Sequence, residues 1–421
     1  MINSRLKADL IHSSQYGRNP LCTVSSYQQL SPDNGVSRIA GSLENKKIRD
    51  YAVQCMQECG LQISIDSFGN IFGRKEGLVK NIGSVMFGSH LDSVINGGQF
   101  DGALGVFTAI DAIRRLNKES FSNKRPLEIV IFTGEEGSAF GTTLLGSSAF
   151  TGYLPAEEVL QMKNKEGKTF KETMQEIGYY GIEKKDLGDI AYFIELHIEQ
   201  GPILYQEKIP IGIVESITGL LWMYITITGE PNHAGTTPMN LRKDALLAAS
   251  SIIQFLNKEA KKLGDNKGSS TVATVGKLDV SPNGINIIPG KVKIGVDIRD
   301  KKEDNIHLLK EKMLEKIKQL IEDLKLNIEY DIAISIPPQP LSAEVMESIK
   351  VSAEKLGYKY KFINSGATHD AQNMARITKT GMIFLPSING ISHSPLEWTD
   401  WEDIEKGAQV LTETLKILAG K

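Results

Sequence analysis

Four short and almost wholly apolar runs, separated by helical patterns, constrain the fold of this chain more than any other feature. The runs are Ser84–Gly88, Leu127–Thr133, Ala191–Leu196 and Gly381–Leu385. Short apolar runs that alternate with helices are typical of buried strands in a parallel sheet with helices on both faces. Helical patterns accompany the runs at 44–59, 105–117 and 402–418. The pattern therefore predicts an α/β domain with a mostly parallel sheet.

The middle of the chain follows a different pattern. Half-exposed strand patterns and two helical patterns occur there in the order β-α-β-β-α-β, which is the ferredoxin-like split arrangement. The segments are 221–228, 243–263, 271–280, 291–299, 304–324 and 328–334. We therefore predict a second domain at 214–332, inserted into a first domain that comprises 1–213 and 333–421. A chain of 421 residues also exceeds what one hydrophobic core usually serves.

The charge of the chain restricts its partners. With 48 Lys and Arg against 51 Asp and Glu, the formal net charge is −3, so the basic field that a nucleic acid or an anionic membrane needs is missing. No apolar stretch approaches the roughly 18 residues that span a bilayer. Because Met1–Tyr16 also has no continuous apolar core, we expect neither a membrane segment nor a secretory signal.

The cysteines indicate a reducing compartment. Three of them, Cys22, Cys55 and Cys59, form an odd and sparse set, which predicts reduced thiols and a cytoplasmic location. Cys55 and Cys59 stand four residues apart in a predicted helix. A metal-binding pair is one interpretation, but two packed core thiols are favoured because a free Cys usually behaves as a small buried hydrophobe.

Side chains capable of chemistry follow the ends of the predicted strands. His90 and Asp92 follow the first run, Glu135 and Glu136 the second, His197, Glu199 and Gln200 the third, and His393 the fourth. Asp101 comes eleven residues after His90, flanked by glycines that let backbone approach closely. In a parallel sheet, ligands bind outside the carboxyl ends of the strands. We therefore expect three imidazoles and several carboxylates to converge at one edge of the sheet.

Such a set indicates a metal site. Mixed imidazole and carboxylate ligands suit zinc, and also manganese, cobalt or nickel. Five ligands that share one carboxylate would hold two ions roughly 3.5–4 Å apart, as in two-metal hydrolases. Asp92 is placed to accept the second ring N–H of His90. The adjacent acids Glu135 and Glu136 suit a division in which one binds metal and the other transfers protons.

The alternatives to this interpretation are weaker. A single His at a strand end is usually a satisfied polar group, so only the conjunction of four strand ends favours a metal. His12 and His307 are given no role, and the residues alone leave His369 open. The chain has no G-x-S-x-G elbow, P-loop, G-x-G-x-x-G after a strand, or C-x-x-C pair. No other catalytic chemistry is therefore indicated.

Short motifs run in order along nearly the whole chain: GVSRIAGS, GSHLDSV, GGQFDG, EEGS, ELHIEQGP, NHAGTTPM, NGINIIPGK, DIRD, SGATHDAQ and SINGISHSP. In these motifs the sequence resembles the dinuclear metal amidohydrolases of the hydantoinase/carbamoylase type. That family includes N-carbamoyl-L-amino-acid hydrolase, allantoate amidohydrolase and β-ureidopropionase, and is related to zinc aminoacylases and exopeptidases. So many motifs in one order are highly specific for the family and much less so for the substrate.

The resemblance implies two divalent ions per subunit, Zn²⁺ or alternatively Mn²⁺, Co²⁺ or Ni²⁺. Asp101 would bridge the two ions. The remaining ligands would be His90 and His197 at one ion, and Glu136 and His393 at the other. Glu135 would be the general base. The inserted domain would serve as a lid and dimerisation domain of a homodimer.

Three residues of the inserted domain match positions that the family uses on its substrate. Arg299 suits a substrate carboxylate through its bidentate geometry. Asn286 can assist it, and His233 can steady the tetrahedral oxyanion. Without the resemblance, a turn His, a loop Asn and a strand-surface Arg would carry no such meaning. The sequence leaves open whether Arg299 and His233 act within one subunit or across a dimer.

Further implied substrate-binding residues are Gln200, Gly366 and His369. Two positions depart from the family pattern. The family commonly has Arg after EEGS, where this chain has Ala139, and Gly before the His of SGA-x-HDA, where this chain has Thr368. Neither change removes an implied metal ligand. Both bear on the substrate pocket, so they affect the choice of substrate more than catalysis.

The expected reaction is hydrolysis of the ureido C–N bond of an N-carbamoyl-L-amino acid, a small ureido carboxylate, to the amino acid, carbon dioxide and ammonia. The motifs HLDSV and GLLW favour this substrate, whereas PSINGISH favours allantoate, which is also a ureido carboxylate. An N-acyl amino acid hydrolase and a non-catalytic binding protein on the same fold are the remaining alternatives. A binding protein would be expected to have lost a ligand or the base, and all six positions are filled.

Overall fold

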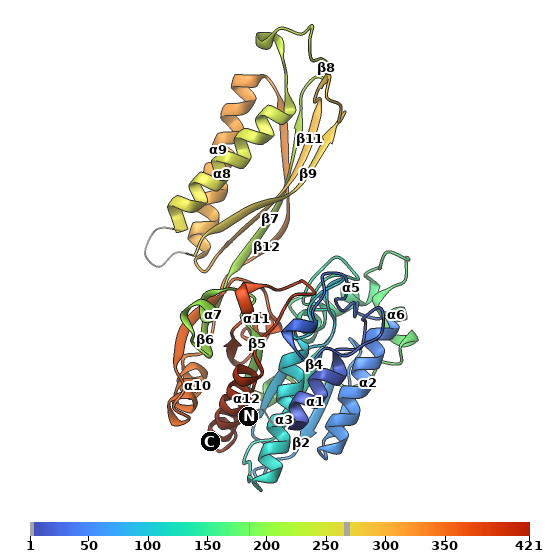
Figure 1. Ribbon diagram of the computed structural model, residues 1–421, viewed down its shortest axis with the longest axis vertical. Helices are drawn as coiled ribbons and strands as arrows, with labels where there is room; N and C mark the ends of the chain where they lie inside the picture. Colours follow the sequence, from blue (N-terminus) through green and yellow to red (C-terminus); the bar gives the residue numbers. More distant parts are fainter. Residues whose placement is uncertain (1–3, 185, 265–269) are drawn as a thin grey trace. The chain divides into compact units, whose positions relative to one another are not determined.

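The computed structural model describes residues 4–184, 186–264 and 270–421, and it divides the chain into two compact units (Figure 1). Unit 1 comprises Met1–Glu215 and Pro340–Lys421, and unit 2 comprises Ser216–Gln339. The second division falls later than the 332 inferred from the pattern. The reason is that strand β12 (Asn327–Ile336) stays paired with β7 (Gly219–Thr228) as far as Ile336 opposite Leu220.

Within the described residues, unit 1 is built on a nine-stranded sheet in the order β1-β2-β4-β3-β5-β15-β6-β13, with β14 paired to β6. The central ladders β4–β3, β3–β5 and β5–β15 are parallel, and β1, β2 and β6 pair antiparallel towards the edges. The strands not yet bounded are β1 (Gln62–Ile65), β2 (Ile71–Lys75), β3 (Ser84–His90), β4 (Leu127–Phe132), β5 (Ile190–Ile198), β6 (Ile211–Ile217), β13 (Gln339–Pro340), β14 (Tyr360–Ser365) and β15 (Lys379–Leu385).

The central strands are covered on both faces. Every residue of β3 and of β4 is buried, and successive side chains of a strand point to opposite faces, so neither face is open to solvent. The helices around the sheet are α1 (Ser4–Ser13), α2 (Leu43–Glu58), α3 (Ala103–Lys118), α4 (Leu145–Phe150), α5 (Ala156–Gln161), α6 (Phe170–Glu176), α7 (Ile203–Glu207), α10 (Ala343–Lys355), α11 (Asp370–Met374) and α12 (Trp401–Ala419). The prediction of an α/β domain with a parallel sheet core is confirmed.

Helix α3 connects this core to the candidate site. It packs against β3, β4 and β5, and its apolar residues from Ala103 to Leu116 are buried. Burial of one Val, Leu, Ile or Phe side chain contributes ~1.5–3 kcal/mol, so the helix is firmly held on the sheet. Its first residue follows Asp101 and Gly102 directly. The position of Asp101 is thereby fixed by the packing of the whole helix.

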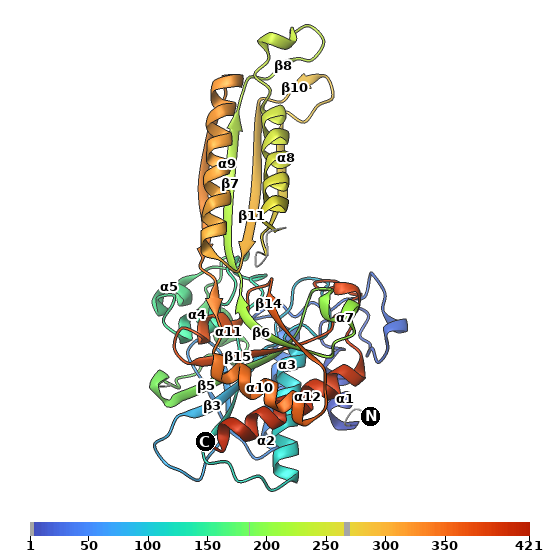
Figure 2. The ribbon, with the colours of Figure 1, turned by 90° about the vertical axis from the view of Figure 1, so that its left-hand side faces the viewer.

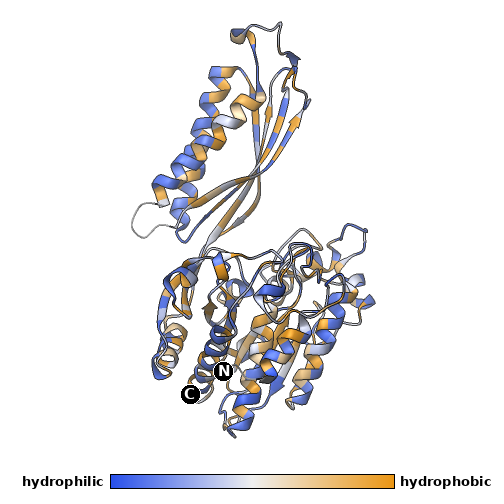
Figure 3. Cartoon of the chain, viewed as in Figure 1, coloured by the Kyte–Doolittle hydropathy of each residue, from blue (hydrophilic) through white to orange (hydrophobic). Residues whose placement is uncertain are grey.

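Unit 2 is a four-stranded antiparallel sheet in the order β12-β7-β11-β9, with β9 (Val272–Ser281) and β11 (Lys291–Asp300) as the remaining strands. Helices α8 (Ala245–Gly264) and α9 (Glu303–Leu324) cover one face, as Figure 2 shows. Buried and exposed residues alternate along β7 and β11, and the hydropathy of the residues alternates with them (Figure 3). The predicted β-α-β-β-α-β arrangement is confirmed, and the other face of the sheet is open.

Short elements complete the description. A two-stranded ladder joins β8 (Asn232–His233) to β10 (Ile287–Ile288). The 3₁₀ helices are η1 (Tyr27–Gln29), η2 (Leu187–Asp189), η3 (Met239–Leu241) and η4 (Ile388–Gly390). All three cysteines are free thiols, of which Cys55 is buried in the core of unit 1. Over the described ranges, no helix is long and apolar enough to cross a membrane.

Candidate metal centre

The predicted ligands meet at the carboxyl ends of the central strands of unit 1. Three groups of side chains there have ligand atoms within 4.8 Å of one another: His90, Asp101 and His197; Asp101, Glu136 and His393; and Glu195, His197 and His369. His90 ends β3 and His197 lies near the end of β5. Parallel neighbouring strands end at the same edge, which explains how residues so distant in sequence come together.

The first group is assembled around one oxygen of Asp101. Its Oδ1 lies 3.5 Å from Nε2 of His90 and 3.1 Å from Nε2 of His197. Gly102 is required next to it, because its φ is +64° and an added Cβ would lie 2.4 Å from Cε1 of His90. A glycine therefore allows the Asp101 backbone to pass directly beside the His90 ring.

Hydrogen bonds orient both imidazoles of this group. Nδ1 of His90 lies 3.1 Å from the carbonyl oxygen of Asp92, and Nδ1 of His197 lies 2.9 Å from that of Ile198. A carbonyl oxygen can only accept, so each Nδ1 must carry the proton. In the neutral imidazole this leaves the lone pair on Nε2, which faces Asp101. Each ring, once it has lost its second proton, is therefore the tautomer that binds a metal through Nε2.

The second group uses the other oxygen of Asp101. Nε2 of His393 lies 3.4 Å from Asp101 Oδ2 and 3.2 Å from Glu136 Oε2. The backbone of His393 is left-handed, with φ of +52°, which is uncommon for a residue with a side chain. Strain of this kind persists only where surrounding contacts hold it, and it concentrates at functional sites. Asp101 is therefore shared between the two groups, one oxygen to each.

The third group differs from the other two because its polar atoms already have protein partners. Glu195 accepts the hydroxyl of Ser89 at 2.7 Å and the backbone N–H of Ala371 at 2.9 Å. Nε2 of His369 lies 2.9 Å from Ser365 Oγ, and the His369 ring stands edge-on to His197 at 4.6 Å. The implied substrate residue His369 is thus buried beside His197. We interpret this group as support for the His197 ring.

The acidic surroundings favour positive charge on the histidines. Burial alone lowers the pKa of His90, but nearby carboxylates, Glu135 and Asp101 foremost, raise that pKa well above its ordinary value. Hydrogen bonds with Asp101 and Glu136 raise the pKa of His393 to about 11. Without a metal ion both rings are therefore cationic at neutral pH. Their protons occupy positions that a divalent cation could take.

The pKa values of the carboxylates shift in opposite directions. Burial raises the pKa of Asp101, but hydrogen bonds from three imidazoles outweigh burial and hold the pKa well below its ordinary value. Burial also raises the pKa of Glu136, and raises that of Glu135 well above its ordinary value. A carboxyl group with a raised pKa suits proton transfer near neutral pH. Oε2 of Glu135 lies 3.8 Å from Nε2 of His90, at the edge of the first group.

The residues present fit a divalent metal. Imidazole nitrogens and carboxylate oxygens are the donors that zinc, manganese, cobalt and nickel take. Among the residues that the structure describes, the buried Oε1 of Glu136 has no hydrogen-bond partner, although a carboxylate oxygen buried without one is costly. Oε1 of Gln200 is likewise without a partner, while Nε2 of Gln200 donates to Asp101 Oδ2 at 2.8 Å. The implied substrate residue Gln200 thus contacts the shared carboxylate itself.

The structure assigns Asp92 a different part from the one expected. Its carboxylate lies 3.9 Å from Nδ1 of His90, and the backbone carbonyl of Asp92 is the closer partner. The carboxylate oxygens instead accept the backbone N–H groups of Gly134, Glu135 and Glu136 at 3.1, 3.3 and 3.1 Å. Asp92 therefore fixes the turn that carries both acids.

Two other strand-end positions, Glu199 and Gly366, do not belong to any of the three groups. The carboxylate of Glu199 accepts the backbone N–H groups of Ile203 and Leu204 at 2.8 Å each, so it stabilises the start of α7. Gly366 is exposed, and an added Cβ would meet nothing within 4 Å. Ala139, the departure after EEGS, lines a cavity of about 380 Å³ together with Ser138, Ile95 and residues 39–42.

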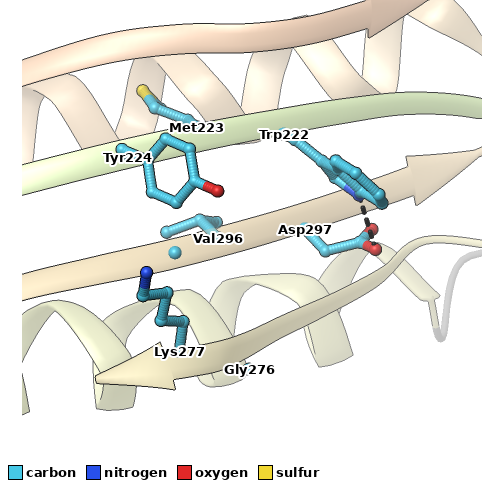
Figure 4. A pocket seen from close by; sticks show the side chains of 8 residues that line it. Trp222, Met223, Tyr224, Gly276, Lys277, Val296 and Asp297 are labelled. Atoms are coloured by element: carbon cyan, nitrogen blue, oxygen red, sulfur yellow. Dashed lines mark hydrogen bonds between the residues drawn. The ribbon is translucent and has the colours of Figure 1, made fainter. Parts of the chain in front are cut away.

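The substrate-binding residues expected in unit 2 form two separate sets. His233 lies opposite Ile287 in the β8–β10 ladder, and the carbonyl of Asn286 accepts the N–H of Ala234 at 3.0 Å, so His233 and Asn286 are neighbours. Arg299 lies on the open face of β11, where its guanidinium donates to Asp297 at 2.9–3.2 Å. Asp297 also accepts the indole N–H of Trp222 at 2.9 Å (Figure 4).

These two sets lie at opposite ends of β11. Arg299 is opposite Leu220 near one end of the strand, and β8 and β10 lie beyond Lys291 at the other end (Figure 2). Arg299 lies eight positions after Lys291, which corresponds to roughly 25 Å in a strand. The structure therefore does not bring Arg299 and His233 of one chain to a common point within unit 2.

A family model described as "Peptidase family M20/M25/M40" matches residues 86–417. The chain belongs to this family. Within it, the chain is 37% identical over 392 residues to an N-carbamoyl-L-amino acid amidohydrolase of Geobacillus stearothermophilus, covering 92% of this chain and 94% of the relative. It is 33% identical over 412 residues to an allantoate amidohydrolase of Escherichia coli (strain K12), covering 97% of this chain and 99% of the relative.

Solved structures agree with the M20 assignment. An amidase of the hydantoinase/carbamoylase family from Burkholderia multivorans matches with a TM-score of 0.90 and 35% identity, covering 100% of this chain and 98% of that chain. This M20 protein is therefore a metal-dependent amidohydrolase of the hydantoinase/carbamoylase type, which acts on C–N bonds other than peptide bonds. The expected family is confirmed.

The sequence pattern did not identify several residues that shape this M20 site. Glu195, Glu397 and Arg38 are fully buried beside or behind the ligands. Glu195 stands two residues before His197 on the same strand, which is a usable signal because such residues share a face. Glu397 and Arg38 lie in irregular segments. Since no periodicity marks such positions, only the folded chain reveals them.

Proposed function

We propose that this protein hydrolyses the ureido C–N bond of an N-carbamoyl-L-amino acid, with allantoate as the alternative substrate. The observation that carries the proposal is the shared carboxylate. Asp101 faces His90 and His197 with one oxygen, and His393 with the other. Such an arrangement is suited to two ions. We assign His90, His197 and Asp101 to one ion, and Asp101, Glu136 and His393 to the second.

The chemistry that divalent cations supply when bound is activation of a water molecule and polarisation of the carbamoyl oxygen. The residues of the chain then position and transfer the proton. Glu135 takes a proton from the attacking water, whose oxygen bonds to the carbamoyl carbon. Glu135 returns that proton to the amino-acid nitrogen as the C–N bond breaks. The carbamate released yields carbon dioxide and ammonia.

His233 is suited to stabilise the oxyanion. Its Nδ1 accepts the backbone N–H groups of Gly235 and Thr236 at 2.9 and 3.2 Å. Because Nδ1 accepts, Nε2 carries the proton in the neutral ring. His233 is exposed, so this N–H is available to an external group. A fixed donor of this kind lowers the energy of a developing oxyanion.

Arg299 is suited to the substrate carboxylate. Its guanidinium donates to Asp297, which in turn accepts the indole N–H of Trp222. The planar guanidinium group is therefore oriented before a ligand binds. Preorganisation reduces the entropy cost of binding. An oriented guanidinium favours substrates that carry a carboxylate, which both N-carbamoyl amino acids and allantoate do.

The separation of Arg299 from His233 supports a dimer in which each site uses two chains. A span of roughly 25 Å along β11 is far longer than a small ureido acid. The end of unit 2 that holds His233 and Asn286 also exposes apolar side chains. Ile285 is 104% exposed and Met239 74%. Apolar groups exposed together commonly mark an interaction surface, so we assign this end to contact with a second copy.

Ala139, which stands three residues after Glu136, bears on the choice between substrates. The cavity lined by Ala139 would be narrowed by the Arg that the family commonly has there. If this cavity receives part of the substrate, the space without that Arg suits the variable side chain of an N-carbamoyl amino acid, whereas allantoate carries a second ureido group and needs polar partners. This supports the carbamoylase over the allantoate alternative.

A substrate panel tests the proposal. The protein, supplied with Mn²⁺, Zn²⁺ or Co²⁺, is assayed with N-carbamoyl amino acids, allantoate, ureidoglycolate and N-acyl amino acids. We expect the highest kcat/KM on an N-carbamoyl-L-amino acid. Arg299→Lys keeps the charge but loses the planar, bidentate geometry of the guanidinium. The kcat/KM for substrates that carry a carboxylate should therefore fall strongly while metal content stays constant. A preference for allantoate would select the alternative, and no turnover with two bound ions would favour a binding protein.

A further inference from the structure

Glu397 of unit 1 makes an unusual set of contacts beside the metal centre. Its side chain is 0% exposed. One oxygen, Oε1, accepts the backbone N–H groups of Phe100 and Asp101 at 3.1 and 3.0 Å. The other oxygen, Oε2, accepts the hydroxyl of Ser392 at 2.8 Å. A single buried carboxylate therefore joins the backbone of Asp101 to the residue immediately before His393.

The loop that carries Asp101 is shaped to receive this carboxylate. A Cβ added to Gly98 would lie 2.1 Å from Cδ of Glu397, so any side chain at Gly98 would displace it. The ring of Phe100 packs edge-on against Trp398 and Trp401, at 5.1 and 5.7 Å between centroids. Aromatic contacts of this geometry add to the energy of burial. The loop therefore packs against the segment that follows His393, both at Gly98 and at Phe100.

Ser392 extends the link to a ligand atom. Its Oγ donates to Glu397 Oε2, and it lies 3.4 Å from Asp101 Oδ2. Oδ2 is the oxygen of Asp101 that faces His393. With its single proton directed to Glu397, Ser392 leaves Oδ2 available on that side. If Glu397 did not accept this proton, the Ser392 hydroxyl could instead donate it to Asp101 Oδ2, which belongs to the second group.

We propose that Glu397 is a positioning residue for the ion held by Asp101, Glu136 and His393. It sets the Asp101 loop and the His393 loop at a fixed separation and keeps the Ser392 hydroxyl turned away from Asp101. This proposal rests on the two-ion site proposed above. Outer carboxylates that orient ligands commonly affect metal affinity by roughly 10–100-fold when they are changed.

Two conservative variants separate this role from simple stabilisation. In Glu397→Gln, the amide oxygen keeps the two backbone donors and the amide nitrogen faces Ser392, whose hydroxyl then turns to Asp101 Oδ2. Ser392→Ala removes the link between Glu397 and the His393 loop. Asp66→Asn is the matched control. The buried carboxylate of Asp66 also accepts two backbone N–H groups, of Phe68 and Asn70, with one oxygen and a side-chain donor, of Asn70, with the other.

The experiment is a titration of the metal-free full-length chains with Mn²⁺ alone, followed by electron paramagnetic resonance, together with thermal unfolding. We expect wild type to bind two ions per chain with a spin-coupled signal. Glu397→Gln and Ser392→Ala should bind one ion roughly tenfold or more weakly, reach the coupled signal only at correspondingly higher Mn²⁺, and keep the other ion within about threefold. Asp66→Asn should lose thermal stability only.

Unchanged affinity for both ions in Glu397→Gln and Ser392→Ala, with a loss of stability like that of Asp66→Asn, would overturn the positioning role. Wild type that binds no Mn²⁺ pair would instead contradict the proposed two-ion site. The two failures are therefore distinguishable.

Discussion

At the scale of single residues, the two adjacent acids have been given different surroundings. Glu136 has one oxygen towards His393, whereas Glu135 lies nearest His90 and is held in a buried position where its pKa is raised well above its ordinary value. Asp92 fixes the backbone of both. The two carboxylates can therefore do different work although they are neighbours in the chain.

The first prediction concerns Glu135. Glu135→Gln keeps the size of the side chain and removes its ability to take a proton, so turnover should fall by roughly 10²–10⁴-fold or more. The content of bound metal, measured by elemental analysis, should stay at the wild-type value. If metal were lost together with activity, Glu135 would be a ligand and the division of the acidic pair would be wrong.

The second prediction concerns pH. His393 has a pKa of about 11 and His90 a raised pKa in the metal-free chain, so both are protonated at neutral pH. A metal binds only the neutral imidazole, so binding must release these protons. Apparent affinity should therefore rise with pH, by roughly tenfold per pH unit for each proton released, between pH 6 and 9. Calorimetry in buffers of different ionisation enthalpy counts the protons.

His393→Ala is the control for this pH dependence. It should weaken metal binding and reduce the number of protons released by about one. An affinity that is the same at pH 6 and pH 9 would mean that the imidazoles are already neutral in the metal-free chain, contrary to their acidic surroundings.

At the scale of elements, the position of His90 depends on close contact between β3 and β4. A Cβ added to Gly88 would lie 1.9 Å from the carbonyl oxygen of Val130, and β5 lies on the other side of β3. The strand cannot move away, because it is paired on both edges and buried on both faces. Gly88 therefore sets the spacing of the strands at the site.

The third prediction follows from this spacing. Gly88→Ala should lower the free energy of unfolding by ~1–3 kcal/mol or more, since overpacking forces the backbone to shift, and it should weaken metal binding through His90. Urea unfolding and a metal titration measure the two effects. Gly276→Ala is the matched control, because Gly276 also lies in a strand and an added Cβ there meets nothing within 4 Å. Equal losses in both variants would contradict the steric explanation.

At the scale of the whole molecule, the proposal places one site on two chains. The metal groups belong to unit 1, whereas His233 and Asn286 stand at the end of unit 2 away from Arg299. If each site uses two chains, activity depends on assembly, because a monomer would lack one set of substrate contacts. The exposed side chains of Ile285 and Met239 would give such an assembly apolar contacts.

The fourth prediction is complementation between two inactive chains. Glu135→Gln and His233→Ala should each be inactive as pure dimers. Mixed one to one under conditions that exchange subunits, they should recover about a quarter of wild-type activity, because half of the dimers are mixed and one of two sites in each is intact. Sedimentation of the mixture verifies the dimer. If no activity returned although mixed dimers had formed, each site would belong to one chain.

The sequence by itself determined the two folding patterns and the candidate ligands at the strand ends. Buried strands read as apolar runs, and parallel strands end at one edge, so His90, His197 and the acids after β4 could be expected to meet. The alternating strands of unit 2 likewise predicted a sheet with one covered face. These are local periodicities, which the chain carries before it folds.

Only the tertiary structure decided which partner each polar group takes. The carboxylate of Glu397 accepts the backbone N–H of Phe100, which lies 297 residues earlier in the chain, and no periodicity of the sequence links the two. Asp92 was expected to orient His90 and instead holds the turn of Glu135 and Glu136, because the backbone donors of that turn come within reach only in the folded sheet. The separation of Arg299 and His233 was likewise decided by the tertiary structure. Both belong to unit 2, and the length of β11 keeps them apart.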